Sequence, residues 1–410
     1  MVTSRKDSKG RVLRKGEIQR KSDGKYVYVY KDVLGRRRYI YSKDLMKLRE
    51  REKGVQRDLD DGIDVYQAMK KDLNWLFERY MGTKINLRRT TKTTYTDTYQ
   101  RYVHDTIGTK VLASFKYSDI MAFYKYLLTE RGLAIKTVKR VHELIQATFD
   151  MAVRDDLIRH NPCYGTYKAL VNETGLKGNR KPALTKEQQD AFINYMVDCP
   201  LYCKWTPLFV FLFGTGCRIG EAVGIRWEDI DFENRRISIN HTLTYRPYCD
   251  IDNKCIYMVD PPKSEAGNRE IPMTQDVYDV MMHEYEFQKE NGFSQLEVEG
   301  MSGFVFTNRF GCLHKANGVN NAIDSIRKAY NAEEIQKADK ENRKPVLIPH
   351  FSCHQIRHTF ATRLCEVESN LKVIQTIMGH SDIRTTMDIY AEATDKGMKD
   401  AMDRLTELKF

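Results

Sequence analysis

The sequence predicts a multidomain protein that is mainly α-helical with small β-sheets. We expect an N-terminal three-stranded sheet plus one helix over residues 1–62, a helical domain over residues 66–170, and a mixed α+β domain over residues 180–410. Two observations predict this organisation. The length of 410 residues exceeds that of one ordinary domain. Helically spaced apolar residues dominate after residue 65, whereas β-rich runs occur only near the N-terminus and after residue 235.

The N-terminal module is predicted from three β-rich runs over residues 16–20, 25–30 and 36–41. An Asp-Gly turn at Gly24 separates the first two runs, and a second turn at Gly35 precedes the third. Ser42 then resembles an N-cap for a charged helix over about residues 43–53. The Gly/Asp-rich residues 54–66 are interpreted as a linker.

The helical domain is predicted over residues 65–162. Its apolar and tyrosine stripes recur at helical spacing, and Ser118 or Asp119 is the expected N-cap of the third helix. Asn161-Pro162 closes the last helix because proline cannot continue it. Residues 163–182 are expected to form a linker. Thr185 and Gln188 then open the third domain in a capping-box pattern.

The net charge is concentrated at the N-terminus. Residues 1–60 carry 19 Lys and Arg against 9 Asp and Glu, which accounts for +10 of the total of +11. Such a compact basic segment is the electrostatic footprint of a nucleic-acid contact, because neutralised phosphates release counterions. The alternative is a solvated, disordered basic tail. We predict DNA contacts from the basic and aromatic residues of the expected strands, namely Tyr28, Tyr30, Arg36, Arg37 and Arg38.

The composition argues against membrane and disulfide-rich classes of protein. No apolar run is long enough to span a bilayer, and the first fifteen residues lack the apolar core of a secretory signal. Nine scattered cysteines, an odd number without zinc-finger spacing, predict reduced thiols and no structural metal. We therefore expect a cytoplasmic protein without a membrane partner.

Five short signals in the last 200 residues carry the chemistry. They are Arg218 in Thr-Gly-Cys-Arg-Ile-Gly-Glu, Lys263 in Pro-Pro-Lys-Ser, His354-Gln-Ile-Arg-His358, Gly379-His380, and Tyr390. Cutting DNA without water needs a nucleophile, charge stabilisation on the non-bridging oxygens, and a proton for the leaving oxygen. Arginine suits the second task because its guanidinium is planar, permanently charged and bidentate toward phosphate.

Each signal has an ordinary structural interpretation beside the functional one. Arg218 follows an apolar run, residues 208–213, that ends in glycines, and could simply pair with Glu221 at a helix end. Lys263 is expected in the turn of a hairpin formed by residues 256–259 and 269–271, where a lysine is usually just solvated. Tyr390 is one of 24 tyrosines.

His354, Arg357 and His358 are predicted to share one face of a helix. The spacing of the two histidines also fits zinc, but position 355 is Gln rather than the Glu of a metalloprotease, and a third ligand is not evident. Gly379 is predicted to end the next helix, which would place His380 just past its C-terminus.

In their order and spacing these signals resemble the tyrosine recombinase (phage integrase) family, and most of all the integrases of conjugative transposons. The resemblance covers about 340 residues, from the helical domain to Tyr390, with residues 66–170 as core-binding domain. Residues 1–62 resemble the arm-binding domain of such integrases. It implies that Tyr390 is the nucleophile and that Lys263 protonates the leaving 5′-oxygen. It further implies that Glu221 supports the first arginine. The remaining catalytic residues it implies are Arg218, His354, Arg357 and His380.

The resemblance also implies partners and products. The protein would cut double-stranded DNA at core sites, form a 3′-phosphotyrosine, and exchange strands in a tetramer through a Holliday junction, so that an element is integrated or excised. No cofactor is implied. An excisionase-type accessory protein is an expected partner, and the protein is expected to act at the nucleoid of a bacterial cell. The C-terminal residues 396–410 could dock on their own domain or on a neighbouring protomer.

Two rival functions use the same residues differently. A type IB topoisomerase would relax supercoils as a monomer, and the small basic N-terminal module argues against it. A non-enzymatic DNA-binding regulator would need none of the five signals, whereas all five are intact.

Overall fold

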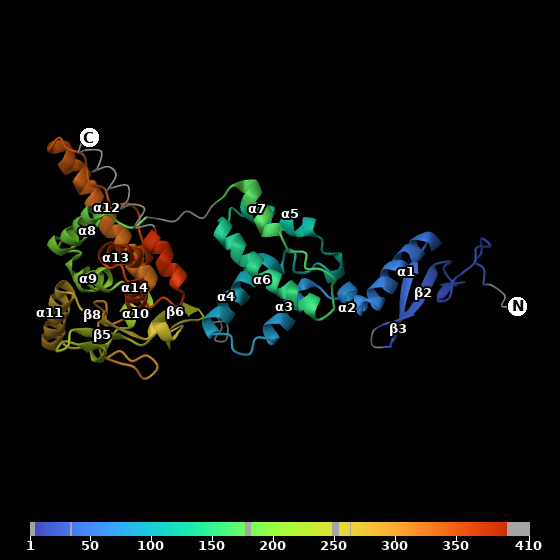
Figure 1. Ribbon diagram of the computed structural model, residues 1–410, viewed down its shortest axis with the longest axis horizontal. Coiled ribbons are helices and arrows are strands. Elements are labelled where there is room, and N and C mark those ends of the chain that lie inside the picture. The colour runs from blue at the N-terminus through green and yellow to red at the C-terminus, as the bar shows by residue number, and fades with distance from the viewer. Residues whose placement is uncertain (1–4, 33–34, 177–181, 248–253, 263, 392–410) are drawn as a thin grey trace. The chain divides into compact units, whose positions relative to one another are not determined.

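The protein is described by a computed structural model that covers residues 5–32, 35–176, 182–247, 254–262 and 264–391. It divides into two compact units, residues 1–179 and 180–410, whose elements are labelled in Figure 1. The predicted fold class is confirmed, because both units are mainly helical and carry small antiparallel sheets. Among the described residues, no helix is long and apolar enough to cross a bilayer.

The N-terminal module is the predicted three-stranded sheet with one helix. Strands β1 (Glu17–Gln19), β2 (Tyr26–Lys31) and β3 (Arg37–Ser42) form an antiparallel sheet in the order β1-β2-β3. Successive side chains of a strand point to opposite faces. Tyr28 and Tyr30 therefore share the face that packs against helix α1 (Leu45–Asp60). The opposite face carries Arg37, Tyr39 and Tyr41, which are exposed.

Two predictions about this module are wrong in detail. Ser42 ends β3 and is not the N-cap; Asp44 caps α1, since its carboxylate accepts hydrogen bonds from the Met46 and Lys47 amides at 2.8 and 3.0 Å. The helix also runs through most of the predicted linker, because Val55 is buried in the module's core and continues the apolar stripe of the helix.

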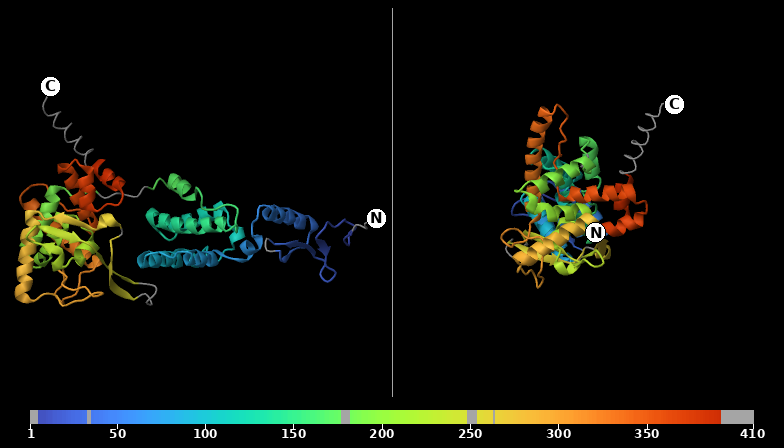
Figure 2. Two further views of the ribbon diagram at one scale, coloured as in Figure 1. Left: turned by 60° about the horizontal axis from the view of Figure 1, so that its bottom comes forward. Right: turned by 90° about the vertical axis from the view of Figure 1, so that its left-hand side faces the viewer.

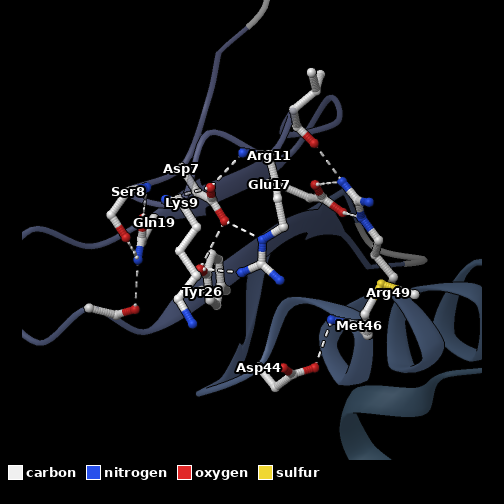
Figure 3. A network of polar contacts seen from close by, with 12 residues as sticks. Asp7, Ser8, Lys9, Arg11, Glu17, Gln19, Tyr26, Asp44, Met46 and Arg49 are labelled. Carbon is white, nitrogen blue, oxygen red and sulfur yellow. Dashed lines mark hydrogen bonds and ion pairs between the residues drawn. The ribbon is translucent and has the colours of Figure 1, made fainter.

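Several charged side chains of this module form ion pairs and hydrogen bonds with one another, as Figure 3 shows. Asp7 accepts hydrogen bonds from Arg11 Nε (2.8 Å) and the Tyr26 hydroxyl (3.0 Å). Glu17, fully buried, accepts both Nε and Nη2 of Arg49 at 2.8 and 2.9 Å. These arginines hold β1, β2 and α1 together, and because each is paired with a carboxylate, the basic excess of the module comes from its other lysines and arginines.

The helical domain comprises α2 (Val65–Lys70), α3 (Leu73–Gly82), α4 (Arg89–Tyr99), α5 (Tyr117–Thr129), α6 (Ile135–Arg154) and α7 (Thr166–Thr174), with a π turn at Gln100–His104. Neither predicted N-cap of α5 is correct: the cap is Lys116, and Asp119 lies three residues inside, where its carboxylate accepts the Lys116 amide at 2.8 Å. Helix α7 lies in the predicted linker. It is held there by Leu170, which is fully buried in the domain core.

The second unit contains α8 (Lys186–Asp198), α9 (Thr206–Thr215), α10 (Ile219–Gly224), α11 (Gln275–Asn291), α12 (Ala316–Lys340), α13 (Cys353–Val367) and α14 (Leu371–Met378). The Thr185–Gln188 capping box of α8 is confirmed. Helix α9 is apolar on all sides because α8, α11 and α13 surround it. Residues 383–391 form a further helical stretch.

The strands of this unit differ from the predicted hairpin. A three-stranded sheet has the order β4 (Ile230–Asp231), β5 (Arg236–Ile239), β8 (Arg269–Pro272), while β6 (Thr242–Pro247) and β7 (Cys255–Asp260) form a separate two-stranded ribbon. The β6–β7 ribbon extends from the body of the unit in Figure 2. The predicted pairing of residues 256–259 with 269–271 is therefore wrong.

A polar break at Asn240 and His241 explains the change of partner. The Asn240 side-chain amide donates to Asp229 at 2.8 Å, and His241 Nε2 lies 2.7 Å from the Gly224 carbonyl oxygen. These contacts hold the chain between β5 and β6, so that the two strands are separate and take different partners.

Candidate active site

Three arginines converge on the C-terminal turn of α14. Arg269 Nε donates to the Ile377 carbonyl at 2.8 Å, Arg357 Nη2 donates to Met378, and Arg218 Nη2 donates to Gly379 at 3.4 Å. A helix C-terminus carries unsatisfied carbonyls and a partial negative charge. The turn therefore gathers three guanidinium groups from three different elements.

Arg218 is oriented by the buried carboxylate of Glu221. Arg218 lies at the N-cap of α10, and its Nη1 donates to Glu221 Oε1 at 2.7 Å. Glu221 Oε2 accepts both the Arg218 amide and Arg269 Nη2 at 2.9 Å. Burial alone would raise the pKa of Glu221, but the charges and hydrogen bonds of Arg269 and Arg218 outweigh it and lower the pKa. The Arg218 side chain remains 46% exposed and accessible to a ligand.

Arg357, in contrast, is buried. It lies on α13, is 4% exposed, and donates Nη1 to the Gly216 carbonyl at 2.9 Å. Burial, reinforced by the charge of Arg218, lowers the pKa of Arg357 to about 10. The guanidinium therefore still carries its charge at neutral pH.

Gly216 is required both for its backbone conformation and for space. Its φ is +62°, and a Cβ atom there would lie 2.3 Å from the Phe360 ring. Gly216→Ala is expected to destabilise the second unit by about 3 kcal/mol, through left-handed strain plus the clash. Gly311 is a matched control, because its φ is +71° and a Cβ would meet nothing within 4 Å; Gly311→Ala should cost only about 1 kcal/mol. Calorimetric unfolding of both variants measures the difference, and equal losses would contradict the steric account.

His380 follows the αL residue Gly379, which caps α14 as predicted. The imidazole is 7% exposed, and its Nδ1 lies 3.0 Å from the Thr386 hydroxyl. Burial, together with the charges of the three arginines, lowers the pKa of His380 to about 4. The ring is therefore neutral at physiological pH, and Nε2 or Nδ1 can carry its single proton.

This lowered pKa predicts a pH dependence of stability. Because the folded pKa lies below the unfolded value of about 6.5, protonation favours the unfolded chain. The contribution of His380 is complete above pH 6.5 and is lost as the pH falls toward 4. We expect the free energy of unfolding of the wild type, relative to His380→Asn, to fall by at most about 3 kcal/mol over that range. Urea unfolding at several pH values measures it, and parallel curves for the two proteins would refute the assignment.

His354 and His358 lie on α13 one turn apart. His354 is exposed, and partial desolvation together with the charges of Arg357, His358 and Arg218 lowers its pKa. His358 Nδ1 lies 3.4 Å from the Thr362 hydroxyl. In the part of the chain that the structure describes, no three His, Cys, Asp or Glu side chains are grouped so that they could hold a metal ion.

Tyr390 lies in the helical stretch 383–391, ten residues after His380. Its half-buried ring packs against the small apolar cluster of α13 and α14 formed by Ala361, Cys365, Ile374 and Met378. Thr386, one turn earlier in the same stretch, contacts His380. The structure therefore brings Arg218, Glu221, Arg357, His354, His380 and the Tyr390 segment into one region.

The other predicted site residues are placed differently. Lys263 lies outside the described residues. Tyr28 and Tyr30 are buried against α1, with the Tyr28 hydroxyl donating to Gln56 at 3.2 Å, so they are not presented on a surface. Arg38 pairs with Asp32 at 2.9 Å and stacks on the Tyr66 ring. Arg36 and Arg37 are exposed.

Sequence reasoning missed two residues of the site. Arg269 entered only as part of the context of Lys263, although its charge within an otherwise apolar strand end was a usable signal. Thr386 was not singled out, although its position one turn before Tyr390 places the two residues on the same face of a helix.

Comparisons with known proteins show which family the sequence belongs to. The sequence model of the Phage integrase family matches residues 182–396, and that of the DNA binding domain of Tn916 integrase matches residues 1–59. The transposase from transposon Tn1545 of Streptococcus agalactiae is 31% identical, over all of this chain and 98% of that protein. The transposase from transposon Tn916 of Enterococcus faecalis is 30% identical over the same shares.

Solved structures show the same likeness. The Tn1549 transposon integrase in complex with a circular intermediate DNA matches with a TM-score of 0.68 and 29% identity, over 82% of this chain and 99% of that one. A second structure of that integrase, in complex with transposon right end DNA, matches with the same TM-score and identity, over 82% of this chain and all of that one.

Proposed function

This chain belongs to the phage integrase family and is a tyrosine site-specific recombinase that integrates and excises DNA, and from this premise we propose which residues perform each step. Tyr390 is the nucleophile. Its phenolic oxygen attacks the scissile phosphorus, a Tyr–O–P bond forms, and the bond from phosphorus to the 5′-oxygen breaks. The product is a 3′-phosphotyrosine and a free 5′-hydroxyl, whose attack on another phosphotyrosine reverses the step.

Arg218 and Arg357 hold the two non-bridging oxygens as negative charge develops on them. Arg218 is accessible and Arg357 is buried, and their guanidiniums donate to the neighbouring carbonyls of Gly379 and Met378. Preorganised donors of this kind commonly supply the largest single term in such reactions. Glu221 fixes the direction of Arg218, and His380, neutral and hydrogen-bonded to Thr386, can donate one further hydrogen bond.

Two proton transfers complete the step. A phenol loses its proton only near pH 10 in water, so the nucleophile needs a base. His354 suits that role, because it is exposed and its lowered pKa keeps it able to accept a proton. Lys263 is assigned, from its sequence context alone, as the acid that protonates the 5′-oxygen.

The observation that carries this proposal is the convergence of three guanidiniums and His380 on one helix end, with the Tyr390 segment packed beside it. Incubating the protein with nicked DNA that carries the ends of its own element, in EDTA, tests it. The nick lets the cleaved fragment diffuse away, so a protease-sensitive covalent adduct should accumulate. Absence of an adduct on these substrates would favour the regulator function. Relaxation of supercoils without partner sites would favour the topoisomerase function.

We infer that the N-terminal module binds DNA through the sheet face opposite α1. That face presents exposed Arg37, Tyr39 and Tyr41, with the Tyr39 and Tyr41 rings stacked 6.5 Å apart. The face toward α1 is filled by core side chains. The aromatic contribution therefore comes from the tyrosines of β3, and Arg36 and Arg37 supply phosphate contacts.

Substitutions on the two faces separate these assignments. Tyr39→Ala and Arg37→Ala should each weaken binding to the element's arm sites, and Arg37→Ala should reduce the slope of log affinity against log salt by about 0.9, as for one phosphate contact. Lys47→Ala, on the exposed side of α1, and Tyr28→Phe, which removes only a hydroxyl, should change neither quantity. Fluorescence anisotropy at several salt concentrations measures both. Weaker binding by Tyr28→Phe alone would restore the original assignment.

The remaining partners follow from the same reaction. Strand exchange between two duplexes requires four active sites, so we propose a tetramer on DNA at core sites, with arm sites held by the N-terminal module. An excisionase-type protein would then select the direction of the reaction on the bacterial nucleoid. Deleting residues 1–62 should change the dependence on arm sites without abolishing cleavage.

A further inference from the structure

Arg269 is a buried charged residue beside the site, and its contacts suggest a role other than direct DNA binding. Its side chain is 2% exposed. Its three nitrogens are all used: Nε donates to Ile377, Nη1 to the Gly267 carbonyl at 3.2 Å, and Nη2 to Glu221. A buried arginine with this set of partners links three separate segments of the unit.

The first link fixes the turn that carries His380. The carbonyls of Ile377, Met378 and Gly379 are consecutive, and they accept Arg269, Arg357 and Arg218 respectively. Of these three arginines only Arg269 belongs to a strand, β8, where it is paired opposite Ile239 of β5. Strand β8 therefore fixes the position of the α14 turn. The carbonyls of that turn then hold the guanidiniums of Arg357 and Arg218 in place.

The second link fixes Arg218 through Glu221. The two carboxylate oxygens of Glu221 accept hydrogen bonds from different arginines: Oε1 from Arg218 Nη1 and Oε2 from Arg269 Nη2. Without Arg269, this buried carboxylate would have Arg218 as its single cationic partner and would draw that side chain inward. Close packing reinforces the arrangement, because a Cβ atom on Gly379 would lie 2.9 Å from Arg269 Nη1.

We propose that Arg269 is a positioning residue for strand cleavage: it holds Arg218, Arg357 and His380 as one rigid group by tying Glu221 and the 377–379 turn to strand β8. This rests on the function proposed above. It is distinct from a general stabilising role, because it predicts a loss confined to the recognition of phosphate charge. Displacements of about 1 Å at a site of this kind can cost on the order of 100-fold in rate.

The test compares two substrates that differ in one charge. Adduct formation is timed at saturating DNA on a nicked duplex with an ordinary scissile phosphate, and on one in which a methyl group replaces a non-bridging oxygen. The cleavage rate of the neutral methylphosphonate depends less on correctly placed guanidiniums, because this linkage lacks the negative charge that they neutralise. Arg269→Met should slow cleavage of the phosphodiester by about 100-fold, and slow cleavage of the methylphosphonate much less. Arg218→Ala serves as the reference for a directly affected contact.

Several controls keep the inference separate from the proposed function. Arg236→Met removes an arginine from the neighbouring strand, where it is 59% exposed and pairs with Glu270, and should change neither rate. Arg269→Met combined with Glu221→Gln should cost less than the sum of the two single effects, since both act on one network. If Arg269→Met does not fold, Arg269→Lys, which keeps the charge but cannot reach all three partners, should show the same altered ratio.

Equal slowing of both substrates by a folded Arg269 variant, or no slowing at all, would overturn the positioning role while leaving the proposed function intact. Failure of the wild type to form an adduct on the phosphodiester would instead count against the proposed function.

Discussion

Tyr390→Phe is expected to abolish the covalent protein–DNA adduct while leaving DNA affinity unchanged. The substitution removes only the phenolic oxygen, so the ring keeps its packing on the α13–α14 cluster. Removing a covalent nucleophile commonly lowers the rate by at least about 10⁴-fold. Gel analysis of the trapped complex, together with a binding measurement on intact duplex, checks both parts.

A second half-buried tyrosine provides the control. Tyr278 on α11 lies in the same unit, and the Arg235 guanidinium lies 4.4 Å from the centre of its ring. Tyr278→Phe keeps that ring contact and should leave adduct formation at the wild-type level. An adduct that persists in Tyr390→Phe would show that another residue is the nucleophile.

Arg218→Ala is expected to give the second-largest loss, about 10²–10³-fold in the cleavage rate, as for the removal of one preorganised oxyanion donor. Because the side chain is 46% exposed and Glu221 keeps Arg269 as a partner, the fold should tolerate the change. Single-turnover cleavage at saturating DNA isolates the chemical step from binding.

Arg236→Ala is the matched charge deletion for this experiment, and it should cleave at the wild-type rate. A variant of Arg218 that cleaves normally but binds DNA weakly would place this arginine in ground-state binding and not in stabilisation of the transition state.

Local patterns predicted much of the fold, and long-range pairing explains most of the errors. The three-stranded sheet, the Thr185–Gln188 capping box and the Gly379 cap depend on residues close in sequence, and all three are confirmed. The partner of β7 does not depend on such residues. Side-chain contacts of Asn240 and His241 with segments eleven and seventeen residues away decide it, and no alternation pattern encodes them.

The candidate site shows the same division. Arg218, Arg357 and His380 stand in recognisable motifs, so their residue numbers could be read from the sequence. Arg269 could not be recognised in this way, because its significance lies in contacts with residues 48 and 108 positions away. The tyrosines of the N-terminal sheet illustrate a further limit: alternation predicts two faces, but only the packing of α1 determines which face is buried.

The most direct test of the account is to identify the residue that becomes attached to DNA. Trypsin cleavage after Arg384 and Lys396 releases residues 385–396, in which Tyr390 is the only tyrosine. The account predicts that mass spectrometry of the trapped, nuclease-treated adduct finds this peptide carrying a nucleotide through its 3′-phosphate on Tyr390. A linkage to any other residue, or to a 5′-phosphate, would contradict it.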